Sequence, residues 1–153
     1  MDTDAVLQQL LDERDVRETV TRVFTATDRR DWKTVEACFS ETVAFDMTSL
    51  AGGQPARLGP AEITRAWAAG LAPIDRVHHQ LGNFEIAIAG DSARASCYGI
   101  AFHHRKIAGP HGVRRFVGSY DVRLTRRADG WKIEAFTFDV AFVDGNLELE
   151  KAT

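Results

Sequence analysis

The chain has 153 residues and a formal net charge of −3, and hydrophobic residues make up 44% of it. This length suits one domain and is too short for two comfortable cores. A net negative charge does not favour nucleic-acid binding, which requires a clustered basic face, so we expect no nucleic-acid partner. We therefore expect residues 1–153 to form a single globular domain.

The cysteines and the N-terminus point to a cellular compartment. Cys38 and Cys97 lack the spacing of a redox or metal motif and are typical of buried thiols in a reducing environment. The first residues are acidic, where a signal peptide would be basic, and no apolar run approaches membrane-spanning length. These features predict a cytoplasmic protein without a membrane partner.

Basic residues gather only late in the chain. The cluster is interrupted by Asp121 and Asp129, which favours a solvated strand face over a binding site. Its members are Arg114, Arg115, Arg123, Arg126 and Arg127.

The first half of the chain has helical periodicity. Apolar residues recur at helical spacing over 5–28, which predicts one long helix or two that meet near residues 12–15. Asp31 is placed to cap a second, short helix. A short strand is expected over 43–47. After a turn-rich loop, Pro60 precedes a third helix over 61–69 that Gly70 closes.

The second half alternates with a period of two. We predict strands over 77–89, 92–107, 113–127 and 131–143, joined by short turns that make neighbours antiparallel. Helices followed by a meander give an α+β domain with the helices on one face of a curved sheet. Glycines near mid-strand, at positions 82, 99 and 118, would allow sharp bends or bulges.

Six segments are informative through their order and spacing: residues 24–32, 39–46, 59–63, 77–83, 118–121 and 129–133. Together they resemble the SnoaL-like proteins of the nuclear-transport-factor-two-like (NTF2-like) superfamily. The resemblance spans nearly the whole chain. It implies a half-open cone in which N-terminal helices pack on a strongly curved, mixed but mainly antiparallel sheet around a pocket. The family includes dehydratases, polyketide cyclases and a dehydrochlorinase, together with non-catalytic subunits of ring-hydroxylating dioxygenases.

The resemblance places Asp28 and His79 at the positions of a catalytic pair. In the dehydratase and dehydrochlorinase relatives, an aspartate ending the first helix orients a strand histidine that abstracts a proton. An imidazole is a good base near neutral pH, and a carboxylate on its other nitrogen fixes the tautomer. Read without the family, Asp28 is a turn former and His79 a core histidine.

Other residues are candidates for contact with a ligand. Adjacent strand residues leave opposite faces, so His78 and His79 cannot chelate one ion, and neither can His103 and His104. We therefore expect no metal and no cofactor. One of the polar residues near the end of the second long strand, His103, His104 or Arg105, is a candidate for the pocket, and so are two phenols, although each is also an ordinary strand residue. The candidate ligand-binding residues are Trp67, Tyr98, Phe102, His104 and Tyr120.

Three polar groups of the best-known relatives are absent. The helix tyrosine of the dehydratases has no equivalent before Asp28, Val23 replaces the lysine of the dehydrochlorinase, and residues 135–137 lack an arginine. Dehydrohalogenation is therefore disfavoured. Two hypotheses stand: a cofactor-independent lyase, isomerase or cyclase acting on a small apolar, polyketide-like or steroid-like ring compound, or a non-catalytic ligand-binding or assembly module. In either case we expect a homodimer or a higher homo-oligomer.

Overall fold

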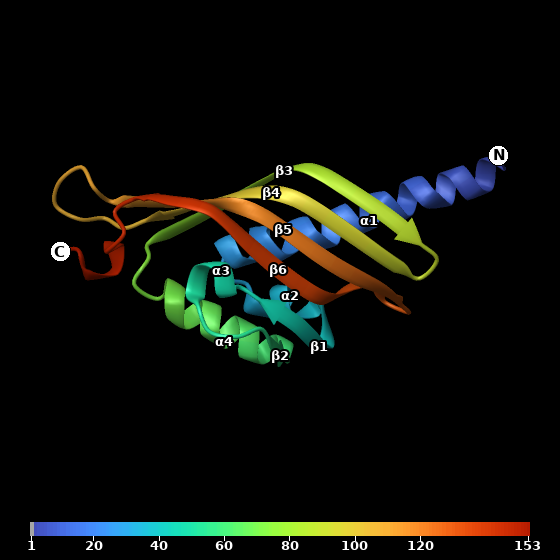
Figure 1. The fold of residues 1–153 in the computed structure, drawn as a ribbon, viewed down its shortest axis with the longest axis horizontal. Coiled ribbons are helices and arrows are strands. Elements are labelled where there is room, and N and C mark those ends of the chain that lie inside the picture. Colours follow the sequence, from blue (N-terminus) through green and yellow to red (C-terminus); the bar gives the residue numbers. More distant parts are fainter. Residues whose placement is uncertain (1) are drawn as a thin grey trace.

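The structure is a computed structural model that describes residues 2–153. It confirms the α+β class, with helices first and a long antiparallel meander after them (Figure 1). The helices are α1 (Thr3–Asp28), α2 (Trp32–Ala37), α3 (Thr48–Ala51), α4 (Pro60–Leu71) and the 3-10 turn η1 (Leu149–Lys151). The strands are β1 (Phe39–Asp46), β2 (Ala56–Leu58), β3 (Arg76–Ala89), β4 (Ser92–His104), β5 (Val113–Arg127) and β6 (Gly130–Gly145).

Local sequence explains where the helices begin and end. The first helix is continuous to Asp28, which settles the alternative of two helices. Asp31 caps α2 by accepting a hydrogen bond from the Thr34 amide at 3.2 Å. Helix α4 begins at Pro60 as expected, but it runs through Gly70 to Leu71. The short elements α3 and β2 were not predicted, because each is shorter than the window over which periodicity can be read.

One mixed sheet carries all six strands in the order β2-β1-β6-β5-β4-β3. Strands β3 to β6 pair antiparallel, and β1 lies parallel to β6. Helix α1 lies along one face of the meander (Figure 1). Helices α3 and α4 lie on the same side, α3 against β6 and α4 against β1. The predicted half-open cone is therefore confirmed, and its concave side is the side that α1 partly fills.

The sheet bends at irregularities in its register. Strand β3 shifts between Gly82 and Glu85, where Asn83 has a positive φ of 54°. Strands β5 and β6 shift next to Gly118. Gly99 causes no shift and has another role, because a Cβ there would collide with the ring of Tyr120. Two of the three glycines thus lie at bends, and the third makes room for an aromatic side chain.

The predicted solvated arginine face is wrong for two of its members. Arg114 is only 8% exposed. Arg126 donates to both carboxylate oxygens of buried Asp12, at 2.8 and 2.7 Å, and its guanidinium lies over the Trp131 ring. Both arginines occupy even positions of β5, and these positions face α1 and the concave side.

Candidate active site

A cavity of about 400 Å³ opens on the concave side of the sheet. Helices α1, α3 and α4 and strands β1 and β3 to β6 all contribute to its wall. Most of the wall is apolar, and its polar side chains are Thr27, His79, His103 and Tyr120. The apolar side chains include Phe24, Phe45, Met47, Leu50, Trp67, Phe116, Phe136 and Phe138. The volume and the few convergent polar groups are typical of a small-molecule site.

Asp28 and His79 form a hydrogen-bonded pair at this cavity. The Nδ1 atom of His79 lies 2.6 Å from Oδ1 of Asp28, and the backbone N–H of His79 donates to Oδ2 at 2.9 Å. The His79 side chain is 11% exposed and the Asp28 side chain is 17% exposed. Because a carboxylate can only accept, Nδ1 carries a proton, and the neutral form of this imidazole has its lone pair on Nε2.

The ends of two elements place this pair. Asp28 is the last residue of α1, and β3 is an edge strand whose backbone N–H at His79 has no neighbouring strand to bind. The chain turns after α1 through Arg30, which has a positive φ of 57° and donates to the Leu71 carbonyl at 3.1 Å. The Asp28 carboxylate thus orients the imidazole ring of His79 and also accepts the hydrogen bond of that residue's backbone N–H.

His103 lines the cavity with a different partner. Its Nδ1 lies 3.3 Å from Nη2 of Arg114, and its ring lies edge-on to Phe116 with centroids 4.9 Å apart. Burial, and then the charge of Arg114, lower the pKa of His103 to about 4. The imidazole is therefore neutral at physiological pH.

Tyr120 presents a neutral phenol to the same space. The residue is 5% exposed, and burial raises its pKa well above the ordinary value for tyrosine, with Cys97 and Asp28 adding to the effect. Its ring packs against Phe24 and Phe138, at centroid distances of 4.6 and 4.7 Å. A phenol that keeps its proton can donate a hydrogen bond to a ligand oxygen.

The structure divides the other predicted ligand-binding residues into two groups. Trp67 lines the cavity together with Tyr120. Tyr98, Phe102 and His104 are not in its wall, and Tyr98 is 64% exposed. All three occupy even positions of β4, whereas the buried residues Cys97 and Ala101 occupy odd positions. The histidine that reaches the cavity is His103, and the choice of His104 has to be corrected for this reason of strand parity.

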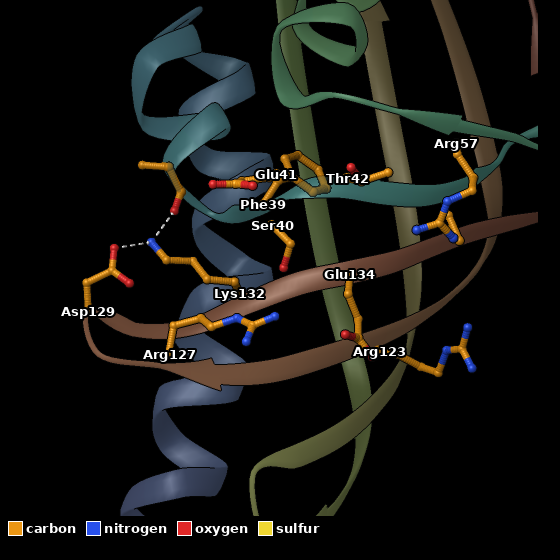
Figure 2. Close-up of a pocket in the computed structure, with 12 residues that line it drawn as sticks. Phe39, Ser40, Glu41, Thr42, Arg57, Arg123, Arg127, Asp129, Lys132 and Glu134 are labelled. Atoms are coloured by element: carbon orange, nitrogen blue, oxygen red, sulfur yellow. Dashed lines mark hydrogen bonds and ion pairs between the residues drawn. The ribbon is translucent and has the colours of Figure 1, made fainter.

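A larger groove of about 930 Å³ lies on the opposite face of the sheet. Figure 2 shows that its wall is polar, with Arg127, Lys132 and Glu134 among the side chains that border it. Neither Asp28 nor His79 takes part. Despite its size, we consider this groove a weaker candidate, because its wall is far more polar than that of the concave cavity, and small-molecule sites are mostly apolar.

Other kinds of site find less support. Across residues 2–153, no group of three or more His, Cys, Asp or Glu side chains is arranged to hold a metal ion. Both cysteines are free and buried. Among the helices of the described chain, none combines the length and apolar character that a bilayer crossing requires.

Sequence reasoning missed Arg114 and Glu150 as neighbours of the cavity. The two residues are 36 positions apart and form an ion pair in which Arg114 Nη1 donates to Oε2 of Glu150 at 2.9 Å. The chain carries no motif that links them. The one available signal was strand pairing, since the predicted hairpin brings β5 beside β4 and Arg114 opposite His103.

Comparisons with known protein families and solved structures agree with the fold described above. The model of the SnoaL-like domain matches residues 8–137. A protein of Kribbella flavida is 21% identical, with 94% of this chain and 99% of that one covered and a TM-score of 0.86. A Novosphingobium aromaticivorans protein described as an aromatic ring hydroxylase is 26% identical, with coverages of 93% and 98% and a TM-score of 0.76. A scytalone dehydratase-like protein of the same organism is 14% identical, with coverages of 89% and 88% and a TM-score of 0.74.

A comparison with curated proteins finds no match. The domain match covers most of the chain, and the solved structures share its fold. The chain therefore belongs to the SnoaL-like domain family, and it shares the fold of an NTF2-like protein of Streptomyces avermitilis.

Proposed function

We propose that the cavity is a cofactor-independent active site that transfers a proton at carbon in a small apolar ring compound. The observation that carries the proposal is the Asp28–His79 pair, with 2.6 Å between Oδ1 and Nδ1, at the wall of an apolar cavity. His79 is held in the tautomer in which Nε2 can accept a proton. The reaction class is that of a lyase, isomerase or cyclase.

The first step breaks a C–H bond beside a carbonyl group. Nε2 of His79 takes the proton, and the electron pair of the bond moves into the carbonyl to form an enolate. Asp28 stabilises the imidazolium that results, because its carboxylate already binds Nδ1–H. The hydroxyl of Tyr120, which keeps its proton at neutral pH, is placed on the same cavity wall to donate to the enolate oxygen.

The enolate can then react in two ways with the same residues. Imidazolium can return its proton to a different carbon, which is an isomerisation. It can instead protonate a hydroxyl group on the neighbouring carbon, so that water leaves and a double bond forms, which is a dehydration. Both outcomes return His79 to its starting form.

A non-catalytic role in binding or assembly is the second candidate. It is favoured by exposed apolar side chains on the outer face of the sheet, where Tyr98 is 64% and Phe142 is 55% exposed. Such residues suit contact with another chain. We rank this candidate second because it leaves the Asp28–His79 pair at the cavity with a structural role alone.

The experiment follows deuterium uptake from heavy water by proton NMR. The probes are β-tetralone, a fused two-ring ketone, and a β,γ-unsaturated ketosteroid. We expect the wild type to accelerate exchange beside the carbonyl group and His79→Gln to lose this acceleration. His78→Gln is the matched control, because His78 is the neighbouring exposed histidine on the other face of β3. Equal exchange by the wild type and His79→Gln would overturn the mechanism.

A further inference from the structure

The C-terminal turn closes one end of the cone. Leu149 is fully buried in a cluster with Leu71, Ile74 and Val77. Arg105, just after β4, donates to the carbonyl of Leu149 at 3.1 Å and also to that of Glu150. The turn is therefore part of the packed domain, and it brings the Glu150 carboxylate to the beginning of β5, beside Arg114.

One guanidinium connects this turn to the cavity. Arg114 binds both carboxylate oxygens of Glu150, at 2.9 Å from Nη1 to Oε2 and through a second contact from Nη2 to Oε1. The same Nη2 lies 3.3 Å from Nδ1 of His103, the residue directly opposite on β4. The guanidinium also lies 4.9 Å above the ring of Phe116, a residue of the cavity wall.

The chemistry of the contact fixes the state of His103. A guanidinium has only donors, so Nδ1 of His103 accepts and cannot carry a proton. The remaining proton of the neutral imidazole is then on Nε2, which is a hydrogen-bond donor on a side chain that lines the cavity. The charged and titratable groups around it are Arg114 on β5, Glu150 on η1, His79 on β3 and Asp28 on α1.

We propose that Glu150 is a positioning residue for the cavity: through Arg114 it holds His103 as the neutral Nε2–H tautomer, ready to donate to an oxygen of the ligand. The proposal narrows the ligand class to ring compounds with an acceptor oxygen placed to reach His103 while a C–H bond faces His79. It rests on the proposed function for the ligand, but the tautomer of His103 is independent of any turnover.

The test reads the tautomer directly, by proton–nitrogen NMR of protein labelled at its histidines. The His103 signals are assigned by their loss in His103→Gln. In the wild type at neutral pH we expect Nε2 protonated and Nδ1 free. Glu150→Ala is expected to give a mixture of tautomers, because Arg114 loses the partner that orients it. Glu150→Gln keeps an acceptor oxygen for Arg114 and is expected to restore most of the Nε2–H form.

Deuterium exchange on the ketone probes supplies the second readout. We expect kcat to fall on the order of tenfold in Glu150→Ala, less than for loss of an oxyanion donor outright, with KM changing little. Glu148→Ala is the matched control, since Glu148 lies beside the same turn and pairs with Lys151 at 3.0 Å, not with Arg114. Thermal melting identifies any variant whose fold is lost, and Glu150→Gln then carries the comparison.

The outcomes separate this inference from the proposed function. A changed tautomer in Glu150→Ala with no exchange by any protein would support the positioning role and overturn the proposed catalysis. Exchange that depends on His79, with the same His103 tautomer and the same kcat in the wild type and Glu150→Ala, would overturn the positioning role. A wild-type His103 protonated on Nδ1 would also overturn it.

Discussion

The cavity contains two histidines on neighbouring strands, and they differ in the charge of the group that binds them. His79 on β3 binds the carboxylate of Asp28, whereas His103 on β4 binds the guanidinium of Arg114. The carboxylate places a proton on Nδ1 and leaves Nε2 as a base. The guanidinium takes the lone pair of Nδ1 and leaves Nε2–H as a donor. One side-chain type can thus supply opposite chemistry within a single pocket.

The largest effect is expected where the base loses its charged partner. Asp28→Asn keeps the size of the side chain but removes the negative charge that stabilises the imidazolium. We expect the rate of deuterium exchange to fall by about two to four orders of magnitude. The double variant Asp28→Asn with His79→Gln should be no slower than His79→Gln alone, because the two residues act as one unit. Additive losses would show that Asp28 acts independently of His79.

A smaller loss is expected at the donor histidine. His103→Leu removes one hydrogen-bond donor while an apolar group still fills part of the space, and we expect kcat to fall about a hundredfold. The matched control is His104→Leu, on the opposite face of β4, with activity expected within twofold of the wild type (roughly the scatter of surface substitutions). Equal losses in both variants would remove the distinction between the two faces of β4.

The pH dependence of stability tests the state of His103 without any substrate. Its pKa is lowered to about 4 in the folded protein, below the value of 6.5 expected for an unperturbed histidine. As the pH falls, His103 therefore becomes protonated in the unfolded chain at a higher pH than in the folded protein. The contribution of His103 to the free energy of unfolding should decrease from about pH 6.5 and level off near pH 4, with a total change of up to about 3 kcal/mol.

Urea unfolding of the wild type and His103→Gln over this pH range measures that contribution. The glutamine variant should lose the part of the pH dependence that His103 causes. Parallel curves for the two proteins would mean that His103 is not held neutral by its surroundings.

The smallest effects are expected in the polar groove on the other face of the sheet. Arg123 and Arg127 border this groove (Figure 2), and neither His79 nor His103 is part of its wall. Changing either residue to Gln should alter the free energy of unfolding by no more than about 0.5 kcal/mol and leave ketone exchange unchanged. A large loss of exchange in Arg127→Gln would move the active site to the outer face.

Much of the fold could be predicted because its signals are local. The apolar spacing over residues 5–28, the Asp31 cap and the turns between long alternating segments each act over a few neighbouring positions. The four long strands begin and end within a few residues of their predicted limits. The family resemblance then brought Asp28 and His79 together, and the structure places them in hydrogen-bond contact.

The sequence by itself determined the long elements and their order, and its resemblance to a family indicated the aspartate–histidine pair. Only the tertiary structure decided which face of each strand is inside. Alternation divides β4 into two sets, but His103 rather than His104 reaches the cavity because α1 packs on the odd-numbered side. Arg114 lies on the concave side of β5, where it binds Glu150 of the C-terminal turn. The contact between Arg114 and Glu150 depends on where the C-terminal turn packs. No local sequence pattern predicts a contact between residues 36 positions apart.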